Sequence, residues 1–288
     1  MPHPPYPPAP TLGIIGLGLI GGSLGLDLRR QGYRVLGVSR RDRTCELATT
    51  QGAVDQASTD FALMAEADWV VLCTPLDVLV PTVEALRPHL RSGTVLTDVG
   101  SVKQPIVEAI APLWPNFVGG HPMAGTTDQG IEAAQFGLFV DRPYVLTPTP
   151  QTPAGAIAAV EALATALGAR LYRCSPEEHD RSVAWISHLP VMVSTSLIQA
   201  CRLEPSERVC ALAQQLASSG FRDTSRVGGG NSELGLLMAR YNREALLQSL
   251  RAYRQSLDGV MAAVEGEDWP QLQQILEQSH GDRPRFVA

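Results

Sequence analysis

A glycine-rich turn directly after a short apolar stretch constrains this chain more than any other feature of its sequence. The run Leu12–Ile15 is followed by the pattern GxGxxG, with glycines at Gly16, Gly18 and Gly21. Such glycines permit a tight turn out of a strand, let the backbone approach a pyrophosphate, and let the next helix close onto the sheet. A glycine-rich turn can be purely structural, but this one lies between a strand and a helix, as dinucleotide binding requires. We expect cofactor contacts from Gly16, Gly18, Leu19, Ile20 and Gly21.

Short apolar segments alternate with helical ones from Thr11 to about Tyr172. This alternation predicts α/β structure, with a parallel, doubly wound sheet of the Rossmann type. We assign it to residues 11–174. The expected strands are Leu12–Ile15, Tyr33–Val38, Trp69–Cys73, Thr94–Asp98, Phe117–Gly119, Tyr144–Thr147 and Arg170–Arg173. The expected helices are Ile20–Gln31, Asp77–Leu90, Gln104–Leu113 and Ala154–Leu167.

The rest of the chain, residues 175–288, has a different character. From Pro176 to about Leu276 apolar residues keep helical spacing, and we predict no strand. Pro190 should kink or interrupt the first helix, because proline removes a helical hydrogen bond. An all-helical segment of this length is thin for an independent core, so we expect it to pack on the first domain and on a second copy of the chain. At the other end, prolines predict an extended, poorly ordered tail over residues 1–10.

Composition excludes several classes of function. The formal net charge of −6 argues against nucleic acid or an anionic membrane as a partner, because phosphate groups need a basic face. The five cysteines form no CxxC pair, and we expect neither a metal site nor a disulfide framework. We find no apolar run approaching the roughly 20 residues of a membrane span and no secretory signal. The chain therefore reads as a soluble protein of a reducing cytoplasm.

The end of the second predicted strand indicates which dinucleotide binds. Enzymes that use NAD usually carry an acidic residue there, which bonds the ribose 2′-hydroxyl. This chain has Ser39, Arg40 and Arg41 instead. A hydroxyl and a guanidinium suit a 2′-phosphate, so Ser39 and Arg40 predict NADP. The alternative is that the two arginines are solvated surface charges.

Three further segments follow predicted strands, and each should lie at the carboxyl edge of the sheet. They are Cys73–Pro75, Asp98–Lys103 and Gly119–Thr126. Ligands of open α/β sheets bind at this edge, so we expect Cys73, Thr74 and Pro75 to contact the nicotinamide half of the cofactor. His121 could take a proton from an alcohol while hydride leaves its carbon. Taken alone, His121 could equally cap a turn.

The amino-acid sequences of these segments resemble those of a known enzyme family. Six segments occur in a fixed order at compatible spacings: GLGLIGGSLG, LCTP, DVGSVK, GGHPMAGT, AWISHLP and SSGFRDTSRVGGGN. Together they closely resemble the prephenate/arogenate dehydrogenase family, and most of all its short cyanobacterial arogenate dehydrogenases. The resemblance runs from about Leu12 to the C-terminus. It implies a Rossmann-type domain followed by an all-helical dimerisation domain.

The resemblance also implies a reaction, the oxidative decarboxylation of arogenate to tyrosine with hydride transfer to NADP. By it, His121 assists deprotonation of the ring hydroxyl, and Ser101 holds the same hydroxyl. Arg226, at the end of the FRDTSR segment, would bind a substrate carboxylate; without the resemblance, Arg222 and Arg226 read as exposed charges. We expect Arg222 and Asp223 to orient Arg226.

The AWISHLP segment has two interpretations. His188 could line the substrate cleft or be a hydrogen-bonded structural histidine. Many relatives carry a second histidine directly after the proline, where this chain has Val191. That departure disfavours prephenate, which carries a ketoacid where arogenate carries an amino acid. His179 and Asp180 we expect to be mainly capping and structural residues.

Three alternatives stay open. One is a prephenate dehydrogenase with the same residues, giving 4-hydroxyphenylpyruvate. A second is a β-hydroxyacid dehydrogenase, but that class uses a lysine of the helical domain, and the sole lysine here is Lys103 in the first domain. The third, from another class, is an NADP-binding sensor without turnover, against which the set His121, Ser101 and Arg226 argues.

Overall fold

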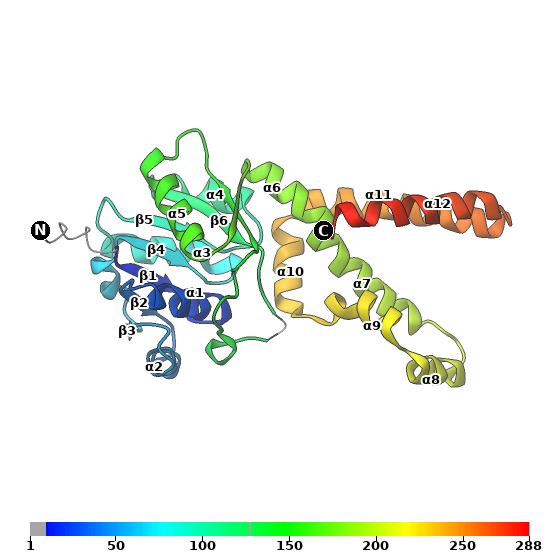
Figure 1. Cartoon of the computed structure of the whole chain (residues 1–288), viewed down its shortest axis with the longest axis horizontal. Coiled ribbons are helices and arrows are strands. Elements are labelled where there is room, and N and C mark those ends of the chain that lie inside the picture. The colour runs from blue at the N-terminus through cyan, green and yellow to red at the C-terminus, as the bar shows by residue number, and fades with distance from the viewer. Residues whose placement is uncertain (1–9, 127, 288) are drawn as a thin grey trace, which may run out of the picture.

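A computed structural model describes residues 10–126 and 128–287 of the chain. The expected tail, residues 1–10, lies outside the described residues except for Pro10. Figure 1 shows a sheet covered by helices in the first part of the chain and, beside it, a group of helices that project away from the sheet. The α/β domain followed by a helical domain confirms the predicted fold class.

One eight-stranded sheet forms the first part, in the order β3-β2-β1-β4-β5-β6-β7-β8. The strands from β3 to β6 are parallel, β7 runs antiparallel to β6, and β8 is parallel to β7. The bounds are β1 (Leu12–Ile15), β2 (Val35–Val38), β3 (Gln56–Ser58), β4 (Trp69–Leu72), β5 (Val95–Asp98), β6 (Phe117–Pro122), β7 (Pro143–Thr147) and β8 (Arg170–Arg173).

Helices cover both faces of this sheet, because successive strand side chains point to opposite faces. In β1, Leu12 and Ile14 join one apolar cluster with Leu24, whereas Ile15 joins a second cluster with Leu79. The helices are α1 (Leu19–Arg30), α2 (Asp42–Thr50), α3 (Leu76–Leu86), α4 (Gln104–Ile110) and α5 (Ala154–Ala166), with short 3₁₀ turns η1 (Phe61–Glu66), η2 (Arg87–His89) and η3 (Ile131–Ala133).

Two elements were not expected from the sequence, β3 and α2. Strand β3 has only three residues, and none of them is fully buried, so it leaves no apolar signal. Helix α2 buries only Cys45 and Ala48, and of its other residues only Leu47 is apolar. Strand β3 is held at the sheet edge by its pairing with β2, and α2 packs mainly on β3.

The second part is helical throughout its described residues. Its elements are α6 (Pro176–Val183), the π-helical turn η4 (Ala184–His188), α7 (Leu189–Cys201), α8 (Glu207–Leu216), α9 (Ser219–Ser225), η5 (Arg226–Gly229), α10 (Ser232–Tyr241), α11 (Arg243–Glu265), α12 (Trp269–Asp282) and η6 (Arg283–Arg285). It docks on the sheet domain partly through α10, whose Leu237 joins the apolar cluster of α3. Helices α8, α11 and α12 extend away from the sheet (Figure 1).

Pro190 interrupts the first of these helices, as the sequence predicts. It lies at the start of α7, and the turn directly before it is the π-helical turn η4. Proline has no N–H to donate to Ile186 four residues earlier, so the regular hydrogen-bond ladder cannot continue. The wider turn ends at His188, which it leaves buried, while Trp185 and Ile186 stay exposed.

The same helix bears on the expectation about membrane spans. The continuous stretch Pro176–Cys201, 26 residues, is long and apolar enough to cross a membrane by length and composition alone. No Asp, Glu, Lys or Arg occurs between Arg181 and Arg202. A core helix of a soluble protein passes the same test, so one helix of this kind is weak evidence for a membrane span. Only 22% of its most apolar window is buried in the single chain, so much of the stretch is available to a partner.

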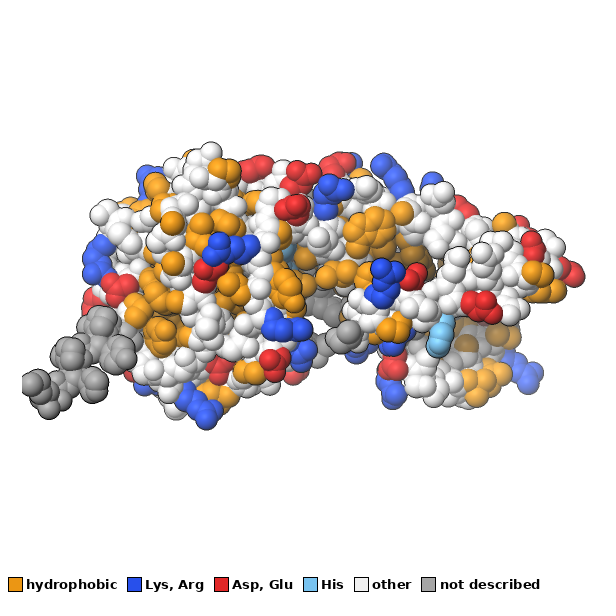
Figure 2. Space-filling model, turned by 45° about the horizontal axis from the view of Figure 1, so that its top comes forward, with side chains coloured by type: hydrophobic (Ala, Val, Ile, Leu, Met, Phe, Trp, Pro, Cys, Tyr) orange, Lys and Arg blue, Asp and Glu red, His pale blue; other side chains and the backbone are white. Residues whose placement is uncertain are grey.

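Apolar side chains are exposed on both parts of the molecule, interspersed with acidic and basic ones (Figure 2). In the helical part they include a stripe on α11, where Leu257, Met261 and Val264 are each nearly half exposed. The spacing of four and three residues places all three on one face of the helix.

Candidate active site

The carboxyl ends of four parallel strands meet at one edge of the sheet. The strand register pairs Ile15 with both Val38 and Leu72, and Leu72 with Asp98. The segments singled out in the sequence follow directly: Gly16 after β1, Ser39 after β2, Cys73 after β4 and Ser101 after β5. The structure therefore brings these expected cofactor and catalytic residues to one edge.

The glycine turn after β1 has the geometry of a phosphate cradle. Gly16 has φ of 97°, and a Cβ there would lie 2.6 Å from the carbonyl oxygen of Cys73. A Cβ on Gly21 would lie 2.1 Å from the carbonyl oxygen of Gly16, so larger residues cannot replace either glycine. A Cβ on Gly18 would meet no atom within 4 Å, and α1 begins without a side-chain cap. The turn leaves space and free N–H groups where a pyrophosphate would lie, which fits a dinucleotide.

The residues after β2 and β4 are open to a ligand in different ways. Ser39 is half-buried and Arg40 exposed, and no acidic side chain among the described residues forms an ion pair with Arg40. Thr74 has a buried Oγ1 with no hydrogen-bond partner in the described part of the chain. Burial raises the pKa of the Cys73 thiol, so Cys73 contributes a neutral, compact side chain.

His121 lies near the end of β6 and is almost wholly buried. Its Nδ1 atom is 2.8 Å from Nε2 of His179, a residue of the helical part of the chain. Nδ1 of His179 is in turn 2.7 Å from Oδ1 of Asp180. His179 and Asp180 belong to α6 and are buried, so a line of hydrogen bonds runs from the sheet into the first helix of the second part.

A buried ion pair fixes the strand that carries His121. Nζ of Lys103 bonds the carboxylate of Asp98 and donates to the carbonyl oxygen of Gly120 at 2.8 Å. Asp98 also accepts the backbone N–H of Gly120 at 3.1 Å. Burial lowers the pKa of Lys103, and the Asp98 carboxylate opposes that shift. Both main-chain groups of Gly120, the residue before His121, are thus held by the pair.

His188 lies close to the same cluster, at the end of the π-helical turn. Its Nδ1 is 3.1 Å from Nδ2 of Asn242, which also donates to the carbonyl oxygen of Asp180 at 2.7 Å. Burial lowers the pKa of His188 to about 4. Its Nε2 is buried and has no partner among the described residues.

Ser101 follows β5, and its Oγ is likewise buried without a partner in the described part of the chain. Buried polar atoms in proteins are nearly always hydrogen-bonded, so each unpartnered one requires an explanation. Ser101, Thr74 and His188 therefore each keep a buried polar atom available to a bound ligand. No hydrogen bond joins Ser101 to His121 among the described residues.

The charge state of His121 suits a base. Burial, aided by the neighbouring charges of His179, Lys103 and His188, holds the pKa of His121 well below its ordinary value. The imidazole is therefore neutral at neutral pH and able to accept a proton.

Arg226 lies outside this cluster. It begins η5 and is exposed, and η5 packs on α7, where Ser194 donates to the carbonyl oxygen of Thr224 at 2.6 Å. Ser194 follows His188 by six residues, which is roughly 9 Å along a helix. Arg222 pairs with Asp223 at 3.6 Å, and among the described residues neither bonds Arg226. The expectation that this pair orients Arg226 finds no contact to support it.

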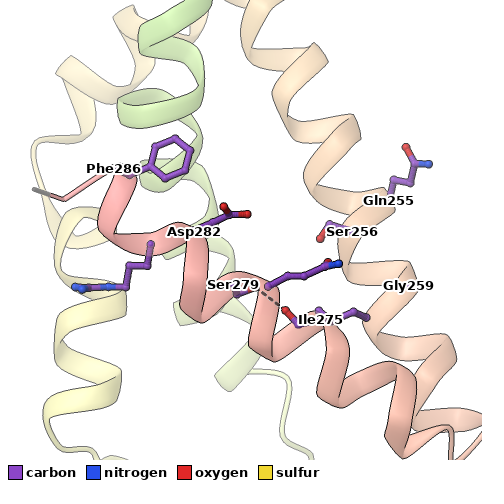
Figure 3. A pocket seen from close by; sticks show the side chains of 9 residues that line it. Gln255, Ser256, Gly259, Ile275, Ser279, Asp282 and Phe286 are labelled. Atoms are coloured by element: carbon purple, nitrogen blue, oxygen red, sulfur yellow. Dashed lines mark hydrogen bonds between the residues drawn. The ribbon is translucent and has the colours of Figure 1, made fainter.

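A separate pocket lies between α11 and α12 (Figure 3), far along the chain from the cluster around His121. It has a volume of about 560 Å³ and is lined by polar groups such as Ser256, Ser279 and Asp282. The only hydrogen bond drawn there, from Ser279 to the carbonyl oxygen of Ile275 at 2.9 Å, is a bond within α12.

The sequence did not indicate three members of the cluster around His121, namely His179, Asp180 and Asn242. The neighbouring pair His179-Asp180 at a helix start is the one signal that could have pointed to them. The signal is weak, because an acidic residue near a helix start usually serves to cap it.

Comparison with known proteins accounts for both parts of the chain. Residues 24–173 match the family model for the nucleotide-binding domain of prephenate dehydrogenase, and residues 175–278 match that for its dimerization domain. A prephenate dehydrogenase of Bacillus subtilis is 32% identical over 265 residues, which are 90% of this chain and 71% of that protein.

Two solved structures are similar over nearly the whole chain. Synechocystis arogenate dehydrogenase is 51% identical with a TM-score of 0.86, covering 96% of this chain and 99% of its own. Prephenate dehydrogenase from A. aeolicus, solved with hydroxyphenyl propionate and NAD⁺, is 26% identical with a TM-score of 0.90, covering 96% and 98%.

Proposed function

Because the chain belongs to the prephenate dehydrogenase family of NAD(P)-dependent oxidoreductases, we propose that it converts L-arogenate to L-tyrosine with NADP as hydride acceptor. The observation that carries this proposal is His121, a buried, neutral imidazole beside the edge where the cofactor turn lies. The 51% identity to the Synechocystis enzyme favours arogenate as the substrate.

In this proposal His121 accepts the proton of the ring hydroxyl on Nε2. The C–H bond at the same carbon breaks with its electron pair, and NADP supplies the acceptor for that hydride. The bond between the ring and its carboxylate then breaks, carbon dioxide leaves, and its electron pair completes the aromatic ring. Ser101 holds the hydroxyl through its unpartnered Oγ, so the oxygen and the base stay aligned.

In this proposal His188 and Arg226 bind the substrate. A free Nε2 on His188 lies in the buried region beneath His121. Arg226 is exposed in the single chain and has no ion pair with a described acidic side chain, so its guanidinium is available to a substrate carboxylate. Residues 11–174 then bind the cofactor, and residues 175–288 complete the substrate site and form the twofold dimer.

NADP, rather than NAD, is proposed from the residues after β2. No acid occurs where a ribose hydroxyl would need one, and Ser39 and Arg40 offer a hydroxyl and an unpaired guanidinium. Cys73, Thr74 and Pro75 would contact the nicotinamide half. We further propose a soluble cytoplasmic enzyme.

The choice of arogenate over prephenate rests on Val191, which directly follows Pro190 in α7. A valine offers no donor to a ketoacid side chain, so this position does not favour prephenate. The prephenate reaction, giving 4-hydroxyphenylpyruvate, is the second candidate function, because the relative from Bacillus subtilis carries that name.

Initial rates of reduced-cofactor formation test the proposal. The purified protein is assayed with arogenate and with prephenate, each with NAD and with NADP. We expect kcat/KM to be highest for arogenate with NADP. Higher kcat/KM with prephenate would establish the second candidate, and the absence of turnover with all four pairs would leave only a dinucleotide-binding protein.

A further inference from the structure

We infer that His179 and Asp180 are positioning residues that set the proton of His121 on Nδ1 and so leave its Nε2 free to act as the base. This inference rests on the proposed function and adds to it the part of the helical domain that makes the base competent. It assigns a role in the reaction to two residues that the sequence left as structural.

Both carboxylate oxygens of Asp180, at the far end of this line of hydrogen bonds, accept from the backbone of the sheet domain. Its Oδ1 accepts the backbone N–H of Lys103 at 2.7 Å, and its Oδ2 accepts that of Gln104 at 2.8 Å. Both oxygens of this side chain thus act as acceptors of main-chain N–H groups, and a carboxylate is an acceptor only. Nδ1 of His179, 2.7 Å from Oδ1, must therefore carry the proton between them.

The second bond follows from the first. A neutral imidazole carries one proton, so with its proton on Nδ1 the Nε2 atom of His179 is an acceptor. That Nε2 is 2.8 Å from Nδ1 of His121, which must then be the donor. His121 in turn keeps its only proton on Nδ1, and its Nε2 presents a lone pair. The Asp180 carboxylate, which His121 reaches through His179, thus decides which nitrogen of His121 can accept a proton.

The same line stabilises the product of proton transfer. When Nε2 of His121 takes the hydroxyl proton, the imidazole becomes a cation in a buried site, where an unpaired charge is costly. Its Nδ1 proton can pass to Nε2 of His179, which leaves His121 neutral and places the positive charge beside the carboxylate of Asp180. One proton enters the line and none is lost, so the step balances.

The surroundings make the anion essential. The other charged or ionisable groups near His121 are Lys103, which is already bonded to Asp98, and His188. Asp98 bonds Lys103 and the backbone of Gly120, and it makes no hydrogen bond with a histidine among the described residues. Asp180 is therefore the anion that contacts this histidine line among the described residues.

Three variants separate a positioning role from a merely structural one. Asp180→Asn removes the negative charge, and the single amide oxygen cannot accept from Lys103, Gln104 and His179 together, so the anion that fixes both tautomers is lost. His179→Gln keeps an oxygen that can accept from His121, so it keeps the tautomer without the charge. His179→Leu removes the acceptor altogether. The matched control is His280→Gln, because His280 is an exposed histidine on α12.

The kinetic readout is the split between kcat and KM for arogenate, with NADPH binding and melting temperature measured for each variant. We expect Asp180→Asn and His179→Leu to lower kcat by roughly 10²–10⁴-fold, the usual size of a general-base contribution, with little change in KM or in NADPH binding. His179→Gln should recover part of that loss, and His280→Gln should match the unmodified enzyme. Unchanged kcat in folded His179→Leu would overturn the inference.

A second measurement does not depend on turnover, or on any variant folding. Nitrogen-15 NMR of the histidine-labelled protein reports which ring nitrogen carries the proton at neutral pH. We expect His121 and His179 both to be protonated on Nδ1 and not on Nε2. A proton on Nε2 of His121 would overturn the inference even if the enzyme turned over arogenate. An inactive enzyme with the expected tautomers would instead count against the proposed function.

Discussion

Asn242 donates its side-chain amide to Nδ1 of His188 at 3.1 Å, so the proton of that neutral imidazole lies on Nε2. The amide is oriented by its other bond, to the carbonyl oxygen of Asp180 at 2.7 Å, which only an N–H can make. His188 therefore presents a buried donor to the site, whereas His121 presents an acceptor. Two histidines with opposite hydrogen-bonding roles suit a substrate that must be both held and deprotonated.

The buried, neutral state of His188 predicts a loss of stability in acid. Its pKa is about 4 in the folded chain against 6.5 when unperturbed, so between these pH values the unfolded chain binds more protons. The free energy of unfolding must then fall as pH drops from 6.5 to 4, by up to about 3 kcal/mol from this group. Urea unfolding at fixed protein concentration should show a shallower fall for His188→Gln, and the same slope for His280→Gln as for the unmodified protein. Equal slopes for all three proteins would contradict the neutral burial of His188.

Cofactor preference should depend on Arg40. Replacing it by alanine removes a charged contact to the 2′-phosphate, worth roughly 1.5–3 kcal/mol, or about 10- to 150-fold in affinity. We expect Arg40→Ala to weaken NADP binding by that factor and to leave NAD nearly unaffected. Arg43→Ala, an exposed charge on α2, serves as the control. Equal catalytic efficiency of the unmodified enzyme with both cofactors would refute the assignment.

Arg226 should act on substrate affinity. Because it is proposed to bind a carboxylate both before and during reaction, Arg226→Ala should raise KM for arogenate more than it lowers kcat. Cofactor binding should stay the same. Arg222→Ala offers a matched arginine four residues away, paired only with Asp223 in the structure. If Arg222→Ala raises KM as much as Arg226→Ala, the effect is one of general charge and not of a specific contact.

The apolar stripe of α11 predicts assembly. Leu257, Met261 and Val264 are exposed along one face of α11. This helix lies within residues 175–278, which match the dimerization domain of prephenate dehydrogenase. We expect a homodimer, with light scattering giving twice the 30.9 kDa of one chain. Met261→Asp places a charge in the middle of this stripe and should shift the mass toward one chain, while circular dichroism keeps its helical signal. A mass near 31 kDa for the unmodified protein at micromolar concentration would rule out the dimer.

The sequence predicted the parts of the fold that leave a local pattern. The GxGxxG turn, the alternation of strands and helices, and the change to an all-helical second part are all local, and the strand bounds agree to within about three residues. Elements with little apolar content, such as β3 and α2, were missed. The line from His121 could not be predicted, because His179 follows His121 by 58 residues and Asn242 lies farther still. Only the packing of α6 and α10 on the sheet brings these side chains together.

The measurement that tests the account most directly is the kcat of His121→Asn with arogenate and NADP, followed across pH. Asparagine keeps a polar side chain but has no basic nitrogen, so it cannot take the hydroxyl proton. We expect kcat to fall by roughly 10²–10⁴-fold with a smaller change in KM. Because burial holds the pKa of His121 well below its ordinary value, the unmodified enzyme should keep its kcat/KM into mildly acidic solution and lose it only as His121 is protonated. The variant should lack that loss, whereas near-normal kcat with an unchanged pH profile would leave His121 a structural residue.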